Sequence, residues 1–65
     1  MNLKLSIDIS LAIAGMNQRQ LAEAINVTPA AVSAMVSRGT CGSESIEKMA
    51  KVFNTKASEF IARGE

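Results

Sequence analysis

The interval between two helical patterns in the middle of the chain constrains the fold more than any other feature of this sequence. Leu21, Ala22 and Ile25 share one face of a helix. Three residues later, Thr28-Pro29 predicts the start of the next helix, because Thr is a good N-cap and Pro at the first helical position has a preset φ. Two helices joined so closely must cross at a steep angle, with their backbones close together at the crossing. Only a small side chain fits there, and Ala22 meets that requirement. The larger apolar residues of this segment are interpreted as core: Leu21, Ile25, Val27, Val32 and Met35.

The spacing of apolar residues near the N-terminus predicts a further helix. Ile7, Leu11 and Ala14 fall on one helical face, and the helix extends over about residues 5–14. Gly15 follows at the position where a left-handed residue ends a helix.

Several polar residues have the positions of helix caps and helix ends. Asn17 and Gln20 have the spacing of a capping box at the start of the helix that contains Leu21. Asn26 and Asn54 suit left-handed positions after a helix, because the short amide can hydrogen-bond locally. Ser43 is predicted to cap another helix, after a loop over residues 38–42.

The C-terminal half predicts two helices. The core face of the first of them consists of Ile46, Met49, Ala50 and Phe53. The second is short and contains Phe60 and Ile61, after which residues 63–65 are expected to fray. We therefore predict that residues 1–65 form a single domain, an all-α compact five-helix bundle.

The composition limits what such a domain can bind. A chain of 65 residues buries only about 60% of its unfolded surface, so its core is marginal. One cysteine allows no intrachain disulfide, and without histidine the common zinc sites lose their ligands. We predict no metal and no cofactor. Cys41 is interpreted as an inert loop thiol in a reduced, cytoplasmic setting.

The same inventory argues against catalysis and against a membrane. Without histidine, activation of a Ser or Cys nucleophile needs a Lys or carboxylate base beside it, and no spacing in the chain suggests one. We expect no enzyme and no small-molecule substrate. No apolar stretch approaches the roughly 20 residues that span a bilayer, so no membrane partner is expected.

The segment QRQLAEAINVTPAAVSAMVS resembles the helix-turn-helix of the Cro and phage-repressor-type (XRE-like) transcription regulators. The resemblance extends from about Ile7 to Phe60, and includes GMNQ before the second helix and IEKMAKVF in the fourth. It implies a lambda-repressor-like DNA-binding domain with its motif at about residues 18–37. It also implies double-stranded operator DNA as the ligand and, commonly, a homodimer.

The resemblance further implies which residues meet DNA. They are Gln18, Thr28, Pro29, Ala30, Ser33, Ala34, Ser37 and Arg38. Asn17 and Arg19, on either side of Gln18, are further candidate DNA-binding residues. Two features depart from the family pattern: Asn26 replaces the usual turn glycine, and Pro29, Ala30 and Ala34 stand where relatives often have Gln, Asn, Arg or Lys. Small residues at these positions suit contacts with thymine methyl groups better than hydrogen bonds to base edges.

Together these features predict a sequence-specific, double-stranded DNA-binding transcriptional regulator. It would be a Cro- or repressor-like protein of phage or prophage type that acts by occupying an operator. A weak homodimer is expected, with apolar surface at Val52, Phe60 and Ile61. The net charge of only +1 means that local arrangement must attract the phosphates. The alternative is a helix-turn-helix scaffold used for protein–protein contact, as in an antirepressor, which bare alanines on the third helix would also suit.

Overall fold

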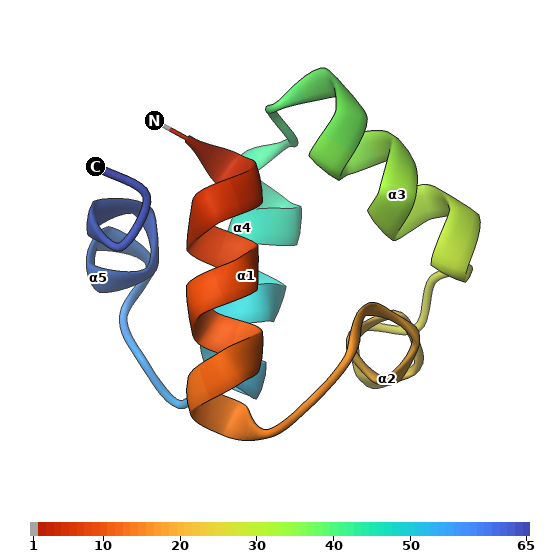
Figure 1. Cartoon of the computed structure of the whole chain (residues 1–65), viewed down its shortest axis with the longest axis horizontal. Helices are drawn as coiled ribbons and strands as arrows, with labels where there is room; N and C mark the ends of the chain where they lie inside the picture. Colours follow the sequence, from red (N-terminus) through yellow and green to blue (C-terminus); the bar gives the residue numbers. More distant parts are fainter. Residues whose placement is uncertain (1) are drawn as a thin grey trace.

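The computed structural model describes residues 2–65, and within them the chain forms five α-helices and no strand. These are α1 (Leu3–Ala14), α2 (Gln18–Ala24), α3 (Pro29–Arg38), α4 (Ser43–Val52) and α5 (Ala57–Ala62). Helix α1 lies in front of α4, with α5 on one side and α2 and α3 on the other (Figure 1). The predicted all-α, five-helix fold is therefore confirmed.

Helix α1 begins two residues before its predicted start. The side chain of Asn2 caps it by accepting a hydrogen bond of 3.1 Å from the Leu5 N–H, and Gly15 ends it at φ 68° as expected. The buried face consists of Leu3, Ser6, Ile7, Ser10 and Leu11. Ala14 was expected on this face but is exposed, because the chain leaves the core in the last turn of the helix.

The connection between α2 and α3 has the predicted local structure. Asn17 and Gln20 form the capping box with hydrogen bonds of 2.8 and 2.9 Å, and Asn26 has a φ of 60°. The Thr28 hydroxyl accepts a hydrogen bond of 3.2 Å from the Ala31 N–H, with Pro29 at the first helical position. Val27 was predicted in the core but is 36% exposed, because the turn after Asn26 carries it outward.

The core lies where all five helices meet. It contains Leu3, Ile7, Leu11, Leu21, Ala22, Ile25, Val32, Met35, Met49, Ala50 and Phe60. Ala22 is fully buried on α2, which packs directly against α3, as the predicted steep crossing requires. Phe60 was expected to offer apolar surface for a dimer, but it is fully buried and stacks on Phe53 with ring centroids 5.9 Å apart.

Two further expectations for the C-terminal half are wrong. The N-cap of α4 is Gly42 rather than Ser43, because the helix begins one residue earlier, and no side chain caps it. Residues 63–65 do not fray: Arg63 donates a hydrogen bond to the Ser10 hydroxyl, and Gly64 is buried against the start of α1. The left-handed residue after α4 is confirmed, since Asn54 has a φ of 54°.

Candidate nucleic-acid interface

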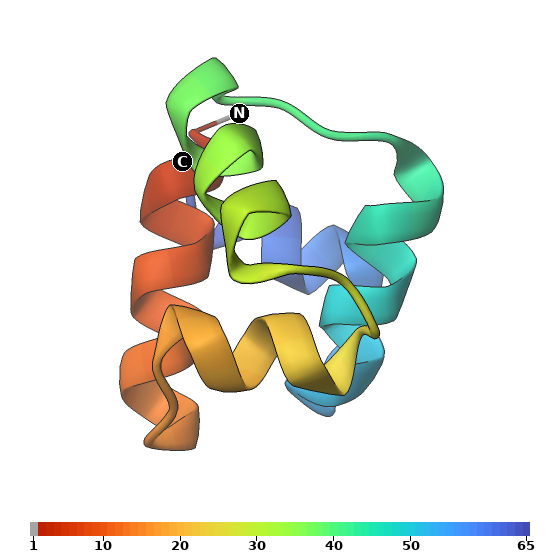
Figure 2. The same cartoon turned by 90° about the vertical axis from the view of Figure 1, so that its right-hand side faces the viewer.

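Helix α3 has one buried side and one exposed side. Val32 and Met35 are buried in the core, three residues apart on one face. The opposite side is exposed, and we call it the α3 outer face: Pro29, Ala30, Ser33, Ala34, Ser37 and Arg38. The view in Figure 2 places α3 in front of the other helices, with α2 beside it. The structure therefore puts every predicted groove-facing residue of α3 at the surface.

The side chains of the α3 outer face extend only a short distance from the helix backbone. Between Pro29 and Arg38 its exposed side chains are two alanines and two serines, so they extend only a methyl or a hydroxymethyl group beyond the backbone. The major groove is about 12 Å wide, and an α-helix with side chains is about 10–12 Å in diameter. Because its outer side chains are short, the backbone of α3 could approach the base edges closely. This face presents methyl and hydroxyl groups and little charge.

The N-terminal end of α2 supplies the other predicted contacts. The capping box uses the side-chain oxygen and backbone N–H of Asn17, and does not use the two N–H donors of its amide nitrogen. Gln18 is half-buried at the first position of α2. Arg19 is exposed and lies 3.9 Å from the Glu23 carboxylate, a loose ion pair that a phosphate could replace.

Arg38 closes the C-terminal end of α3. Its Nε donates a hydrogen bond of 3.4 Å to the carbonyl oxygen of Ala34, and the side chain remains exposed. Gly39 then ends the helix at φ 73°.

In the loop that follows α3, burial raises the pKa of the Cys41 thiol, and the nearby Arg38 charge offsets this only in part. A raised pKa lowers the thiolate fraction, which agrees with the interpretation of Cys41 as an unreactive thiol.

Val27 joins this surface although the apolar pattern predicted it in the core. It is exposed directly before Thr28, at the N-terminal end of α3. Its place immediately after the left-handed Asn26 was the available signal, because a residue in such a turn does not continue the helical face on either side.

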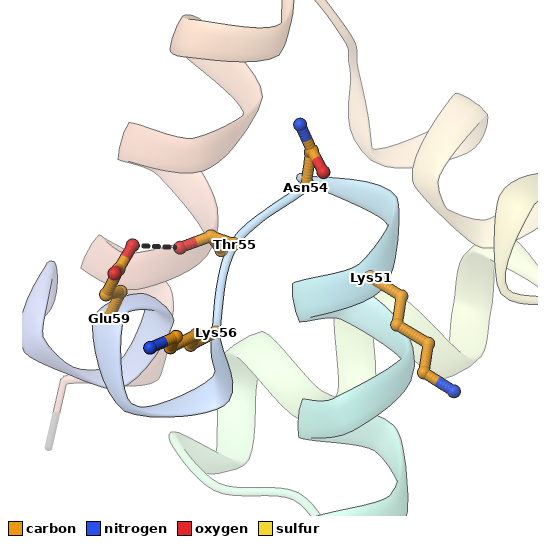
Figure 3. Close-up of a pocket in the computed structure, with 5 residues that line it drawn as sticks. All are labelled: Lys51, Asn54, Thr55, Lys56 and Glu59. Carbon is orange, nitrogen blue, oxygen red and sulfur yellow. Dashed lines mark hydrogen bonds between the residues drawn. The ribbon is translucent and has the colours of Figure 1, made fainter.

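Three pockets among the described residues have no α3 residue in their lining. One of about 460 Å³ lies between α4 and α5 (Figure 3). Its lysines, Lys51 and Lys56, point in opposite directions, and Glu59 accepts a hydrogen bond of 2.7 Å from Thr55. The residues that line this pocket therefore do not converge on a common point. Over residues 2–65, no group of three or more His, Cys, Asp or Glu side chains is placed to hold a metal ion.

No helix among residues 2–65 combines the length and the apolar character needed to cross a membrane.

The tight α2–α3 pair and the exposed side of α3 define a helix-turn-helix domain. A comparison with family models agrees: the model of the helix-turn-helix family matches residues 12–60, well over half of the chain. The chain belongs to this family, the Cro and phage-repressor-type (XRE-like) helix-turn-helix proteins, a family of DNA-binding transcription regulators. Neither the curated proteins nor the solved structures that were compared include a match.

Proposed function

We propose that this chain is a Cro- or repressor-like regulator of phage or prophage type that recognises a specific double-stranded DNA operator and acts by occupying it. The observation that supports this proposal best is the α3 outer face. A short helix that is anchored by buried Val32 and Met35 and exposed along its whole other side fits the major groove.

The proposed contacts fall into two groups. The methyl groups of Ala30 and Ala34 and the hydroxyl of Ser33 would meet base edges, together with Thr28 and Pro29 at the start of the helix. The residues proposed to hold the sugar–phosphate backbone are Asn17, Gln18, Arg19, Ser37 and Arg38. Amide and hydroxyl donors can bind phosphates without adding net charge, which suits a chain whose net charge is +1.

A homodimer is part of this proposal. One helix-turn-helix offers few base contacts, and two copies on one duplex double them. We therefore expect a near-palindromic operator, with half-sites about one helical turn apart.

Selection of bound sequences from a pool of random duplexes tests the proposal. We expect enrichment of a near-palindromic site whose affinity falls steeply with salt, because bound phosphates release counterions. Ala34→Glu should weaken binding to the selected duplex by at least about tenfold, since it places a carboxylate against DNA. Ala24→Glu is the matched control, because Ala24 is exposed on α2 and the change in net charge is the same.

The opposite result would favour the second candidate function. The absence of hydrogen-bond donors on the side chains of Pro29, Ala30 and Ala34 also suits a helix that packs against another protein. If no duplex is enriched and no salt-dependent gel shift occurs, the DNA proposal is wrong, and a protein-contact role of antirepressor type becomes the better account.

A further inference from the structure

Helix α1 carries a second apolar face that is not part of the core. Leu5 is 40% exposed and Ile13 is 68% exposed, while Ile9 between them is half-buried. Residues four apart lie one above the other on a helix, so these three side chains form a continuous ridge, which we call the α1 ridge. The buried face of α1 is formed by other residues, so the core does not account for the ridge.

The charges near the α1 ridge limit the kind of partner that it suits. The ridge itself is uncharged, and Ala12 beside it is small and exposed. The charged residues of α1 are Lys4 and Asp8, and they pair with each other at 2.9 Å. This local neutrality offers no attraction to a strongly acidic or basic partner, and favours an apolar, neutral surface like the ridge itself.

A second copy of this chain provides such a surface with matching spacing. Ile9 is at the centre of the ridge, with Leu5 and Ile13 four residues away on either side. In an antiparallel pair of α1 helices, Leu5 of one copy lies opposite Ile13 of the other. Rows of residues four apart form the ridges that interlock in the commonest class of helix packing. The α1 ridge is therefore complementary to itself.

We propose that the α1 ridge is the surface through which two copies of this chain associate. The proposal rests on the proposed function and deepens it. It names the contact surface that sets the positions of the two α3 helices, one from each copy, relative to each other. Helix α3 packs beside α1 (Figure 1), and its outer face remains uncovered when α1 pairs along the ridge. The α3 outer faces of both copies then stay free.

The size of this contact determines its strength. Helix α1 has 12 residues and is about 18 Å long, so one face of it is a small interface. A standard interface buries about 800 Å² on each partner, which is about a fifth of the 3933 Å² surface of this chain. The ridge is smaller than that, so the free dimer should be weak, with a Kd of about 0.1 mM.

Self-association of the free chain, measured by sedimentation equilibrium up to about 1 mM, tests the proposal without DNA. Ile13→Glu should raise the dimer Kd at least about tenfold, since it places a carboxylate in the apolar contact. Ser58→Glu adds the same charge at an exposed position on α5 and should change the Kd less than about twofold. A wild-type chain that stays monomeric at about 1 mM overturns the proposal, as does an unchanged Kd in Ile13→Glu.

Disulfide trapping provides a second, geometric test. In a Cys41→Ser background, Ile9→Cys places one thiol from each copy next to the two-fold axis, where oxidation should yield a covalent dimer. Glu23→Cys in the same background is the control, because Glu23 is exposed on α2 and should remain monomeric. Equal cross-linking of both variants would show non-specific collision and would overturn the assignment. Circular dichroism of each variant verifies the fold.

These measurements separate the two proposals. A wild-type chain that stays monomeric at about 1 mM but still selects a duplex would overturn only the α1 ridge. Dimerisation through the ridge in a chain that selects no duplex would overturn the DNA function and leave the ridge intact.

Discussion

The guanidinium group of Arg63 donates a hydrogen bond of 2.9 Å to the hydroxyl of Ser10, which lies 53 positions earlier in the chain and is fully buried. One turn away, the Ser6 hydroxyl donates a hydrogen bond of 3.4 Å to the carbonyl oxygen of Ile61. The first turn of α1 and the residues after α5 lie close together in Figure 1, and Gly64 lies against Asn2 and Ser6. These contacts tie the last residues to α1, so the C-terminus is a structural part of the fold.

Arg63→Ala should lower the free energy of unfolding by about 1–3 kcal/mol, because it leaves the buried Ser10 hydroxyl without its charged donor. Urea unfolding followed by circular dichroism measures the change. Arg19→Ala is the control: its ion pair with Glu23 is exposed and 3.9 Å long, so the loss should stay below about 1 kcal/mol. Equal, small effects of both substitutions would show that the Arg63 contact contributes no more than a surface pair.

Gly64→Ala should destabilise the protein by about 1–3 kcal/mol through overpacking. A Cβ at this position would collide with the carbonyl oxygen of Asn2 and with the Ser6 hydroxyl, and the former is backbone that cannot rotate away. Gly42→Ala should change the free energy of unfolding by less than about 1 kcal/mol, because a Cβ there meets no atom. Alanine is a poorer N-cap than glycine, but it also lowers the conformational entropy of the unfolded chain, and these two small effects oppose each other. A Gly64→Ala variant as stable as wild type would mean that residues 63–65 are not packed on α1.

These C-terminal contacts are also the part of the fold that the sequence did not predict. Most caps and turns were predicted correctly because they depend on residues three or four positions apart, as in Asn17 with Gln20; the N-cap predicted at Ser43 is an exception. Burial of Ser6, Ser10 and Gly64 depends on contact between the two ends of the chain, which no local pattern contains. The same reason explains Phe60: a pattern gives the apolar face of a helix, but not how completely its neighbours cover it.

Ala22→Leu should destabilise the protein by about 1–3 kcal/mol or prevent folding, because Ala22 is fully buried in the core of a small domain. Here the sequence was sufficient, since a short connection between two helices requires a small residue at their crossing. Ala24→Leu, at an exposed position of the same helix, should change stability by less than about 0.5 kcal/mol. A melting temperature unchanged by Ala22→Leu would show that the crossing has room for a larger side chain.

Cys41 should react with iodoacetamide more slowly in the folded protein than in urea at pH 8. Burial raises its pKa, so the folded chain has a smaller thiolate fraction, and the rate should rise as the pH increases toward the raised pKa. Arg38→Ala removes the charge that lowers this pKa and should slow the reaction further. The raised pKa also makes stability depend on pH, in the opposite direction to the rate. The contribution of the Cys41 thiol to the free energy of unfolding is full below its unfolded pKa and is lost as the pH rises through the folded pKa. Equal rates in folded and unfolded chains would contradict the prediction.

The exposed side of α3, the candidate DNA surface, could be predicted from the sequence. The spacing of Val32 and Met35 fixes which side of α3 is buried and therefore which side is exposed. The operator sequence could not be predicted. Recognition by hydrogen-bonding side chains can be inferred from the donors and acceptors present, whereas Ala30 and Ala34 offer only methyl groups.

The last prediction follows from that limitation. Ala30 and Ala34 are exposed four residues apart, so their methyl groups lie on one side of α3. The base feature that a methyl group can recognise in the major groove is the thymine C5-methyl. Each operator half-site should therefore contain at least one thymine that faces this pair. Replacing that thymine with uracil should weaken binding by about 0.8 kcal/mol, or about fourfold in Kd, for each thymine methyl group removed.

A variant of the protein assigns the contact to a residue. Ala34→Gly should no longer distinguish thymine from uracil at one operator position, if Ala34 makes the contact there. Ala24→Gly is the control, because it also places a glycine in a helix, with a similar loss of stability, but lies on α2. This variant should keep the full difference in affinity between thymine and uracil duplexes. Gel-shift titrations of matched thymine and uracil duplexes measure both. Equal affinity of the wild-type chain for thymine and uracil at every position would refute methyl recognition, and sequence-dependent DNA shape would then have to account for specificity.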